Sequence, residues 1–286
     1  MSYDFFGKVM KNLLFLLLTL SFVGCSNLLY HPDDIVYSTP KQFNLDYKDL
    51  YFNSKDGTKL HAWLLETKAK KKKGLVVFFH GNAQNLSSHY LSLAWMVNKD
   101  YDLLIFDYRG YGKSEGEPNP KDVNDDAISA LEYGKSLFDK GKYPRFIVYA
   151  QSLGGVIALR GLKDFSARSR VDLLVLDSTF SSYQEIARDR VSQVWFLWPI
   201  QHLTYLLMSD EYASYDYIEQ FDRPALVIHS KDDQVIPLKF GEEIYQKLKV
   251  KKDMWVLEGV PHIGTYHGNA FKERERLLNY LEKLSQ

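Results

Sequence analysis

Ser152 lies where a short apolar segment gives way to small residues, a setting that can activate a serine for chemistry. It is the centre of residues 150–154, AQSLG, between a β-rich segment and a helical pattern. A serine on a sharp strand-to-helix turn, with small residues two positions away on either side, is typical of a nucleophile elbow. Gly154 meets this requirement, and Ala150 replaces the more usual glycine with only one added methyl group. The segment therefore predicts a nucleophilic serine, with a serine that merely caps a helix as the structural alternative.

A serine hydroxyl is a weak nucleophile that needs a base, and the base needs an acid to orient it. Asp232 and Asp233 both lie just past a later β-rich segment, and His262 lies just past the one after that. This order of serine, acid and histidine, each placed behind a strand, predicts a Ser-His-Asp triad. We favour His262 over His267 as the base, because His267 lies nearer the start of the last helical pattern. The residues themselves leave the choice between Asp232 and Asp233 open.

Acyl transfer also needs hydrogen-bond donors for the negative oxygen that develops on the substrate. Residues 80–83, HGNA, follow an apolar β-rich segment and can turn tightly at their glycine. The backbone N–H groups of Asn82 and Leu153 are the expected pair of donors, which makes His80 a structural loop residue. The remaining histidines are expected to be ordinary surface or packing residues: His31, His61, His89, His202 and His229.

These side chains require a sheet whose strands end at one edge. Apolar β-rich segments, of the kind that is buried on both faces of a sheet, occur at 75–79, 103–106, 146–149, 173–176, 225–229 and 254–257. A hairpin pattern precedes them, with two β-rich segments at 49–53 and 59–66 around Asp56-Gly57. Helical patterns lie near 85–98, 121–139, 153–163, 238–249 and 270–284. The alternation predicts an α/β fold with a mostly parallel, eight-stranded sheet and helices on both faces.

One interval breaks this alternation. Residues 180–221 are rich in aromatic side chains, including WFLWP at 195–199, and are too long for a simple crossover. We expect a helical cap inserted over the edge of the sheet.

Several motifs beyond the elbow resemble one known family. They are TP at 39–40, DGTKLHAW at 56–63, HGNA at 80–83 and DYRGYGKSEG at 107–116. Together they resemble the α/β-hydrolase superfamily, in its bacterial lipoprotein and membrane-anchored esterase branch. That branch is similar to depalmitoylase-like and monoacylglycerol-lipase or serine-aminopeptidase-like serine hydrolases. The resemblance runs from about residue 28 to the C-terminus.

The resemblance implies an α/β-hydrolase fold and a serine hydrolase without a cofactor. Its expected reaction is cleavage of a carboxylic ester or thioester of a lipid-like or small acyl substrate, through an acyl-enzyme. The ending Asp-x-Val-Ile-Pro favours Asp233 as the triad acid. Ala150, Ser230 and Pro261 depart from the family pattern but remove no catalytic group. A peptidase of the same fold, or an inactive anchored binding module, are the alternatives.

The N-terminus reads as an export signal. Lys8 and Lys11 precede an apolar run at 13–23, which is too short to span a bilayer and ends at Cys25. Residues 22–25, FVGC, resemble a bacterial lipobox, which implies lipidation of Cys25 and anchoring in the cell envelope. Ser26 by the same resemblance favours the periplasmic face of the outer membrane over the inner membrane.

The expected divisions of the chain are a signal peptide at 1–24, a lipid anchor and lead-in at 25–46, and a hydrolase domain at 47–286 with the cap at about 180–221. Met10 is an alternative start, because the residues after it form a complete signal of this type.

Composition excludes other classes of function. With 36 basic and 36 acidic residues, the chain has no excess of positive charge for binding nucleic acid. A single cysteine excludes an intramolecular disulfide, and no metal-ligand spacing occurs, so catalysis without metal is expected. Residues 112–114, GKS, resemble the end of a P-loop, but Asp107 stands where the first glycine is needed. The expected partners are an acyl ester substrate and a membrane, and no pattern indicates a protein partner.

Overall fold

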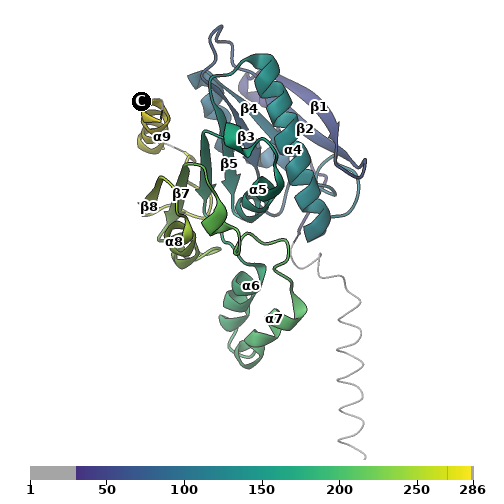
Figure 1. Cartoon of the computed structure of the whole chain (residues 1–286), viewed down its shortest axis with the longest axis vertical. Coiled ribbons are helices and arrows are strands. Elements are labelled where there is room, and N and C mark those ends of the chain that lie inside the picture. Colours follow the sequence, from purple (N-terminus) through teal and green to yellow (C-terminus); the bar gives the residue numbers. More distant parts are fainter. Residues whose placement is uncertain (1–29, 269, 285–286) are drawn as a thin grey trace, which may run out of the picture.

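The computed structural model describes residues 30–268 and 270–284 of the chain. In this part, eight strands form one sheet (Figure 1). The strands are β1 (Tyr47–Asn53), β2 (Lys59–Leu65), β3 (Gly74–Phe79), β4 (Tyr101–Phe106), β5 (Phe146–Gln151), β6 (Leu173–Asp177), β7 (Ala225–Ser230) and β8 (Lys252–Leu257). Their order across the sheet is β1-β2-β4-β3-β5-β6-β7-β8. The predicted hairpin and mostly parallel eight-stranded sheet are confirmed: β1, β2 and β4 pair antiparallel, and all pairs from β4 to β8 are parallel.

Helices cover both faces of the sheet, as the alternation predicted. The α-helices are α3 (Leu86–His89), α4 (Pro120–Gly141), α5 (Leu153–Asp164), α6 (Tyr183–Ser192), α7 (Thr204–Leu207), α8 (Leu238–Lys247) and α9 (Phe271–Lys283). Buried side chains of α4, α5 and α8 share one hydrophobic cluster, whereas those of α3 and α9 share another on the opposite face. Successive side chains of β3 explain the two clusters, because Val77 joins the first and Val76 and Phe78 join the second.

Short 3-10 helices complete the described structure. They are η1 (Pro40–Phe43), η2 (Tyr90–Ser92), η3 (Ala94–Lys99), η4 (Arg168–Arg170), η5 (Trp198–Leu203) and η6 (Ile218–Gln220). The helical pattern expected near 85–98 is therefore a chain of three short pieces, α3, η2 and η3, instead of one continuous helix.

Strand β8 differs from its expected burial on both faces. Trp255 and Leu257 are buried beneath α9, but Val256 on the other face is exposed. The reason is position: β8 lies at the edge of the sheet and pairs only with β7, so its second face is only partly covered.

The interval that broke the sequence pattern forms a helical cap between β6 and β7. It contains α6, η5, α7 and η6, and Figure 1 shows α6 and α7 as a lobe that extends away from the sheet.

The lead-in is bound to the body of the protein. Pro32 forms an isolated bridge with Gln84, and Tyr30 is buried. The predicted signal peptide at 1–24 and the predicted lipid site at Cys25 lie outside the described residues, in which no helix is long and apolar enough to cross a membrane.

Candidate active site

Ser152 sits on the sharp turn between β5 and α5. Its backbone has φ +52° and ψ −122°, a strained conformation for a residue with a side chain. Two hydrogen bonds hold it: the Ser152 N–H donates to the Asp177 carbonyl at 3.0 Å, and the Thr179 hydroxyl donates to the Ser152 carbonyl at 2.6 Å. A Cβ at Gly154 would collide with the Phe79 and His80 carbonyl groups. The predicted need for a small residue at this position therefore has a direct steric cause.

The structure brings Ser152, His262 and Asp233 together from three loops at one edge of the sheet. His262 Nε2 lies 3.0 Å from Ser152 Oγ, and His262 Nδ1 lies 2.7 Å from Asp233 Oδ2. The other oxygen of Asp233 accepts hydrogen bonds from the N–H groups of Val235 and Ile236, each at 2.8 Å. The buried carboxylate is thus fixed on both sides, and it fixes the imidazole in turn.

The electrostatics of Asp233 suit the role of an orienting anion. Burial raises the pKa of its carboxyl group, but the hydrogen bond with His262 and those from the Ile236 and Val235 N–H groups outweigh burial. The net pKa lies below the usual value for aspartate. Asp233 is therefore a carboxylate at neutral pH and stabilises an imidazolium beside it.

The alternatives left open by the residues lie elsewhere. Asp232 accepts a hydrogen bond from the Gly259 N–H at 2.6 Å and does not reach the histidine that contacts Ser152. His267 is exposed, with its Nε2 3.4 Å from the Ser92 hydroxyl. The Nε2 of His229 lies 3.7 Å from Asp233 Oδ2 and donates a hydrogen bond to the Ile236 carbonyl at 2.7 Å.

The two expected oxyanion donors belong to segments that flank Ser152. Leu153 is the first residue of α5, and the N–H groups in the first turn of a helix have no partner within that helix. A Cβ at Gly81 would lie 3.4 Å from Ser152 Cβ, so the backbone that leads into Asn82 runs beside the serine.

The side chain of Asn82 has a role that the sequence did not indicate. Its Oδ1 accepts hydrogen bonds from the His31 N–H at 2.9 Å, the Tyr111 hydroxyl at 2.8 Å and the Ala83 N–H at 2.9 Å. This one oxygen joins the lead-in and the 107–116 loop to the loop at 80–83. No sequence signal reveals such a junction, because His31 and Tyr111 lie 51 and 29 positions away.

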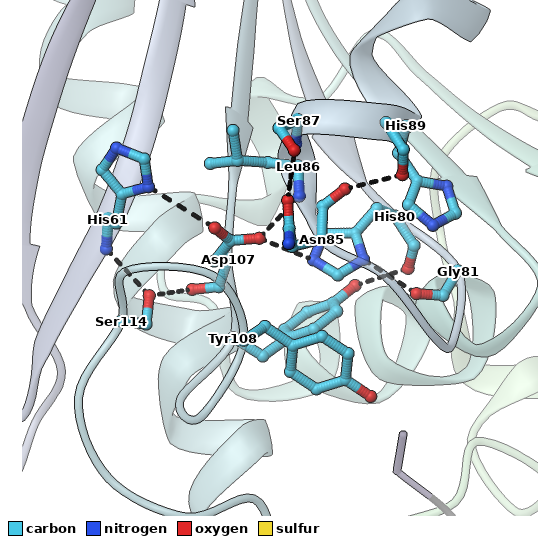
Figure 2. Close-up of polar contacts among 12 residues, drawn as sticks. His61, His80, Gly81, Asn85, Leu86, Ser87, His89, Asp107, Tyr108 and Ser114 are labelled. Atoms are coloured by element: carbon cyan, nitrogen blue, oxygen red, sulfur yellow. Dashed lines mark hydrogen bonds and ion pairs between the residues drawn. The ribbon is translucent and has the colours of Figure 1, made fainter. Parts of the chain in front are cut away.

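A buried network of polar side chains holds the loop at 80–83 in place (Figure 2). Asp107 lies between His61 and His80 and accepts a hydrogen bond from the Leu86 N–H at 2.7 Å. The Nδ1 of His80 contacts the Gly81 carbonyl at 2.7 Å, and the Tyr108 hydroxyl donates to the His80 carbonyl at 3.0 Å. His80 is thus a structural loop residue, and Asp107 ties its loop to the surroundings.

Replacing Asp107 with alanine should lower the free energy of unfolding by about 3–5 kcal/mol, because it leaves buried polar partners without a carboxylate. Burial raises the pKa of Asp107, but contacts with His61 and His80 and the Leu86 N–H outweigh burial and lower it. Because the pKa of Asp107 is lower in the native state than in the unfolded state, its charge stabilises the fold fully at pH values above the unfolded pKa. This stabilisation is lost as the pH falls through the native pKa. Urea unfolding of the wild type and Asp107→Ala at pH 7 measures the loss, and the same comparison at about pH 4 and pH 2.5 should show the difference between them narrowing only below pH 4. Asp46→Ala, an exposed aspartate in a surface pair, is the control and should change stability little; an equal loss in both variants would contradict the prediction.

Ser152 opens into an apolar cavity of about 440 Å³ beneath the cap. Its described lining contains no acidic side chain, and Arg190 is its only lysine or arginine. The lining residues are His31, Asn82, Ser152, Leu153, Phe180, Ile186, Ala187, Arg190, Val191, Met208, Val235 and Ile236. Sequence reasoning missed His31 and Arg190, since their positions depend on how the lead-in and cap fold over the sheet. Among the described residues, no cluster of histidine, cysteine, aspartate or glutamate could hold a metal ion.

Comparisons with known proteins identify a family, relatives in sequence and a similar fold. The family model described as serine aminopeptidase, S33, matches residues 70–213, a range that contains Ser152 but ends before Asp233 and His262. The uncharacterized protein YfhR of Escherichia coli K12 is 30% identical over 257 residues, which cover 87% of this chain and 84% of the relative. The α/β hydrolase domain-containing protein WAV2 of Arabidopsis thaliana is 26% identical, with 86% and 82% covered. The esterase Pf2001 of Pyrococcus furiosus has a similar structure, with a TM-score of 0.70, 24% identity, and coverage of 89% of this chain and 98% of the esterase.

Proposed function

The chain belongs to the serine aminopeptidase-like (S33) family of α/β-hydrolases, enzymes of the hydrolase kind, and we propose that it cleaves carboxylic ester or thioester bonds through a Ser-His-Asp triad. One observation carries the proposal. The hydrogen-bonded chain from Ser152 Oγ through His262 to Asp233, at 3.0 and 2.7 Å, provides a nucleophile, a base and an orienting acid in reach of one another.

In the proposed mechanism, Ser152 Oγ attacks the carbonyl carbon of the substrate while His262 Nε2 accepts the hydroxyl proton. The N–H groups of Leu153 and Asn82 stabilise the oxyanion of the tetrahedral intermediate. His262 then gives its proton to the leaving alcohol or thiol, which departs and leaves an acyl-enzyme. Water attacks the acyl-enzyme by the same route in reverse and releases the acid. Asp233 remains a carboxylate throughout and stabilises the imidazolium.

The cavity favours an apolar acyl group. Side chains from the cap, such as Ile186, Val191 and Met208, supply much of its wall. The family description raises aminopeptidase activity as a second candidate. That activity must bind the positively charged amino terminus of a peptide, for which a carboxylate is the natural partner. Because no acidic side chain lies in the described lining, an ester or thioester of an apolar acid fits the cavity better.

We further propose that the protein is a lipoprotein of a bacterial cell envelope, held by acyl chains on Cys25 at the periplasmic face of the outer membrane. The support is the sequence of residues 8–26, with its basic start, apolar run and lipobox-like ending. More than one acyl chain gives stable anchoring, whereas a single chain binds only marginally. The intact mass of the protein, with Cys25→Ser beside it, reports this modification.

A fluorophosphonate probe tests the proposed hydrolase directly, because it reacts only with an activated serine. We expect intact mass to reveal one adduct on the full chain and none on Ser152→Ala. Labelling of Ser152→Ala at the wild-type level would assign the nucleophile elsewhere. A folded wild-type protein that stays unlabelled would support the inactive binding module instead. Graded acyl esters, thioesters and aminoacyl amides would then identify the substrate class.

A further inference from the structure

The tip of the cap carries an unusual stretch of surface. Residues 191–209 contain no aspartate, glutamate, lysine or arginine, although these residues make up 25% of the whole chain. An uncharged stretch of this length is ordinary in a protein core. Here it forms the end of α6, all of η5 and α7, and the turns between them, in the lobe that extends from the sheet (Figure 1).

Large apolar side chains of this stretch face solvent. We define the apolar tip as six of them: Trp195, Phe196, Trp198, Ile200, Leu206 and Leu207. Trp195 is 86% exposed and Leu206 is 82% exposed. No other stretch of similar length in the described part exposes as many large apolar side chains. A concentration of large apolar side chains on a solvent-exposed surface indicates a site of interaction.

We propose that the apolar tip inserts into the interfacial layer of a lipid bilayer. Tryptophan is enriched at membrane interfaces, and phenylalanine and leucine on one surface bury their apolar area among acyl chains. Contacts between proteins have a polar rim that commonly includes charged groups, and residues 191–209 contain no aspartate, glutamate, lysine or arginine to form one, although Gln193 and His202 are exposed. The chemistry of the tip thus fits lipid better than a protein partner.

The place where the described chain begins also puts the proposed lipid anchor near the cap. The side chains of Tyr30 and Tyr183 belong to one hydrophobic cluster, and burial, together with Tyr183, raises the pKa of Tyr30. The described part of the chain therefore begins near the first residue of α6. Cys25 is five residues before Tyr30, and five extended residues span at most about 18 Å. If Cys25 carries the proposed lipid, its attachment point therefore lies within about 18 Å of Tyr30, near the cap. This step rests on the proposed anchor, whereas the apolar tip stands independently of it.

Docking of the tip would also orient the cavity. Val191 and Met208, at the two ends of the uncharged stretch, line the cavity into which Ser152 opens. The cap therefore connects the lipid-facing surface to the proposed reaction site.

Tryptophan fluorescence tests the proposal, because the two exposed tryptophans, Trp195 and Trp198, both belong to the tip. Of the others, Trp63 and Trp255 are buried and Trp95 is half-buried. The full chain is incorporated into vesicles of phosphatidylethanolamine and phosphatidylglycerol, with or without bromine on the acyl chains. We expect brominated lipid to quench the emission and iodide in the water phase to have little access.

Two variants provide the comparison. Phe196→Asp combined with Leu206→Asp should lose most of the quenching by brominated lipid and become accessible to iodide, even though the N-terminus still holds the protein on the vesicle. Phe271→Asp is the matched control, because Phe271 is exposed at the start of α9 and should leave the quenching unchanged. Circular dichroism checks that both variants are folded, and neither readout depends on catalysis.

The remaining outcomes overturn the proposal. Tryptophans that are shielded from iodide but not quenched by brominated lipid would be covered by protein, either a second copy or the N-terminal segment of the same chain. Wild-type tryptophans that are open to iodide on the vesicle would indicate that the tip stays in water.

Discussion

Replacing His262 with alanine is expected to lower kcat for ester hydrolysis by about 10⁶-fold, the size of loss that follows removal of the base from a comparable serine triad. The reason is that Ser152 Oγ keeps its proton when Nε2, now 3.0 Å away, is gone. Initial rates on a soluble short-chain nitrophenyl ester measure the loss.

The neighbouring histidine supplies the matched control. His267→Ala should leave kcat within about twofold of wild type, since a surface substitution away from the site changes little. His267 is exposed, and its imidazole contacts the Ser92 hydroxyl at 3.4 Å. Equal losses in the two variants would contradict the assignment of the base, and an unchanged rate in His262→Ala would remove the proposed mechanism.

Replacing Asp233 with asparagine should lower kcat by about 10⁴-fold, because an amide in this place favours the wrong tautomer of the histidine. The carboxylate now receives the Nδ1 proton at 2.7 Å and leaves Nε2 free to accept a proton from Ser152. An asparagine amide that donates to Nδ1 would put the histidine proton on Nε2. The same ester assay measures the effect, with circular dichroism to verify the fold.

Asp232→Asn is the control for this second prediction. It changes an acidic side chain of the same loop, which accepts its hydrogen bond from the Gly259 N–H. We expect its kcat to stay within about threefold of wild type. A larger loss in Asp232→Asn than in Asp233→Asn would reverse the choice between the two aspartates.

Most of the fold could be predicted because each signal is local. A run of apolar β-rich residues predicts a buried strand wherever it lies, and alternation with helices predicts a parallel sheet. The burial of β8 could not be predicted in this way, because the sequence of Lys252–Leu257 does not reveal that the strand has only one neighbour. The edge position is a property of the whole sheet.

In the candidate site, too, the features that depend on local sequence could be predicted, and those that depend on distant segments could not. Ser152 belongs to a local motif, and the strained turn follows from the backbone around Gly154. The choice of Asp233 over Asp232 depends on which carboxylate reaches His262, so residues alone left it open. His31 and Arg190 reach the cavity only through the folding of distant segments, and their roles needed the structure.

The cavity has a floor, formed by the backbone around Ser152, and walls supplied by side chains of the cap. The two should differ in how well they tolerate substitution. The floor is backbone with no spare volume: a Cβ at Gly154 would collide with the Phe79 and His80 carbonyl groups, and Ser152 keeps a strained turn. The cap side chains Ile186 and Val191, by contrast, come from a helix outside the sheet. Substitutions there can reshape the space for an acyl group without moving the reacting atoms. Selectivity and reactivity can therefore change independently, and a library aimed at new acyl chains should vary the cap and leave the elbow intact.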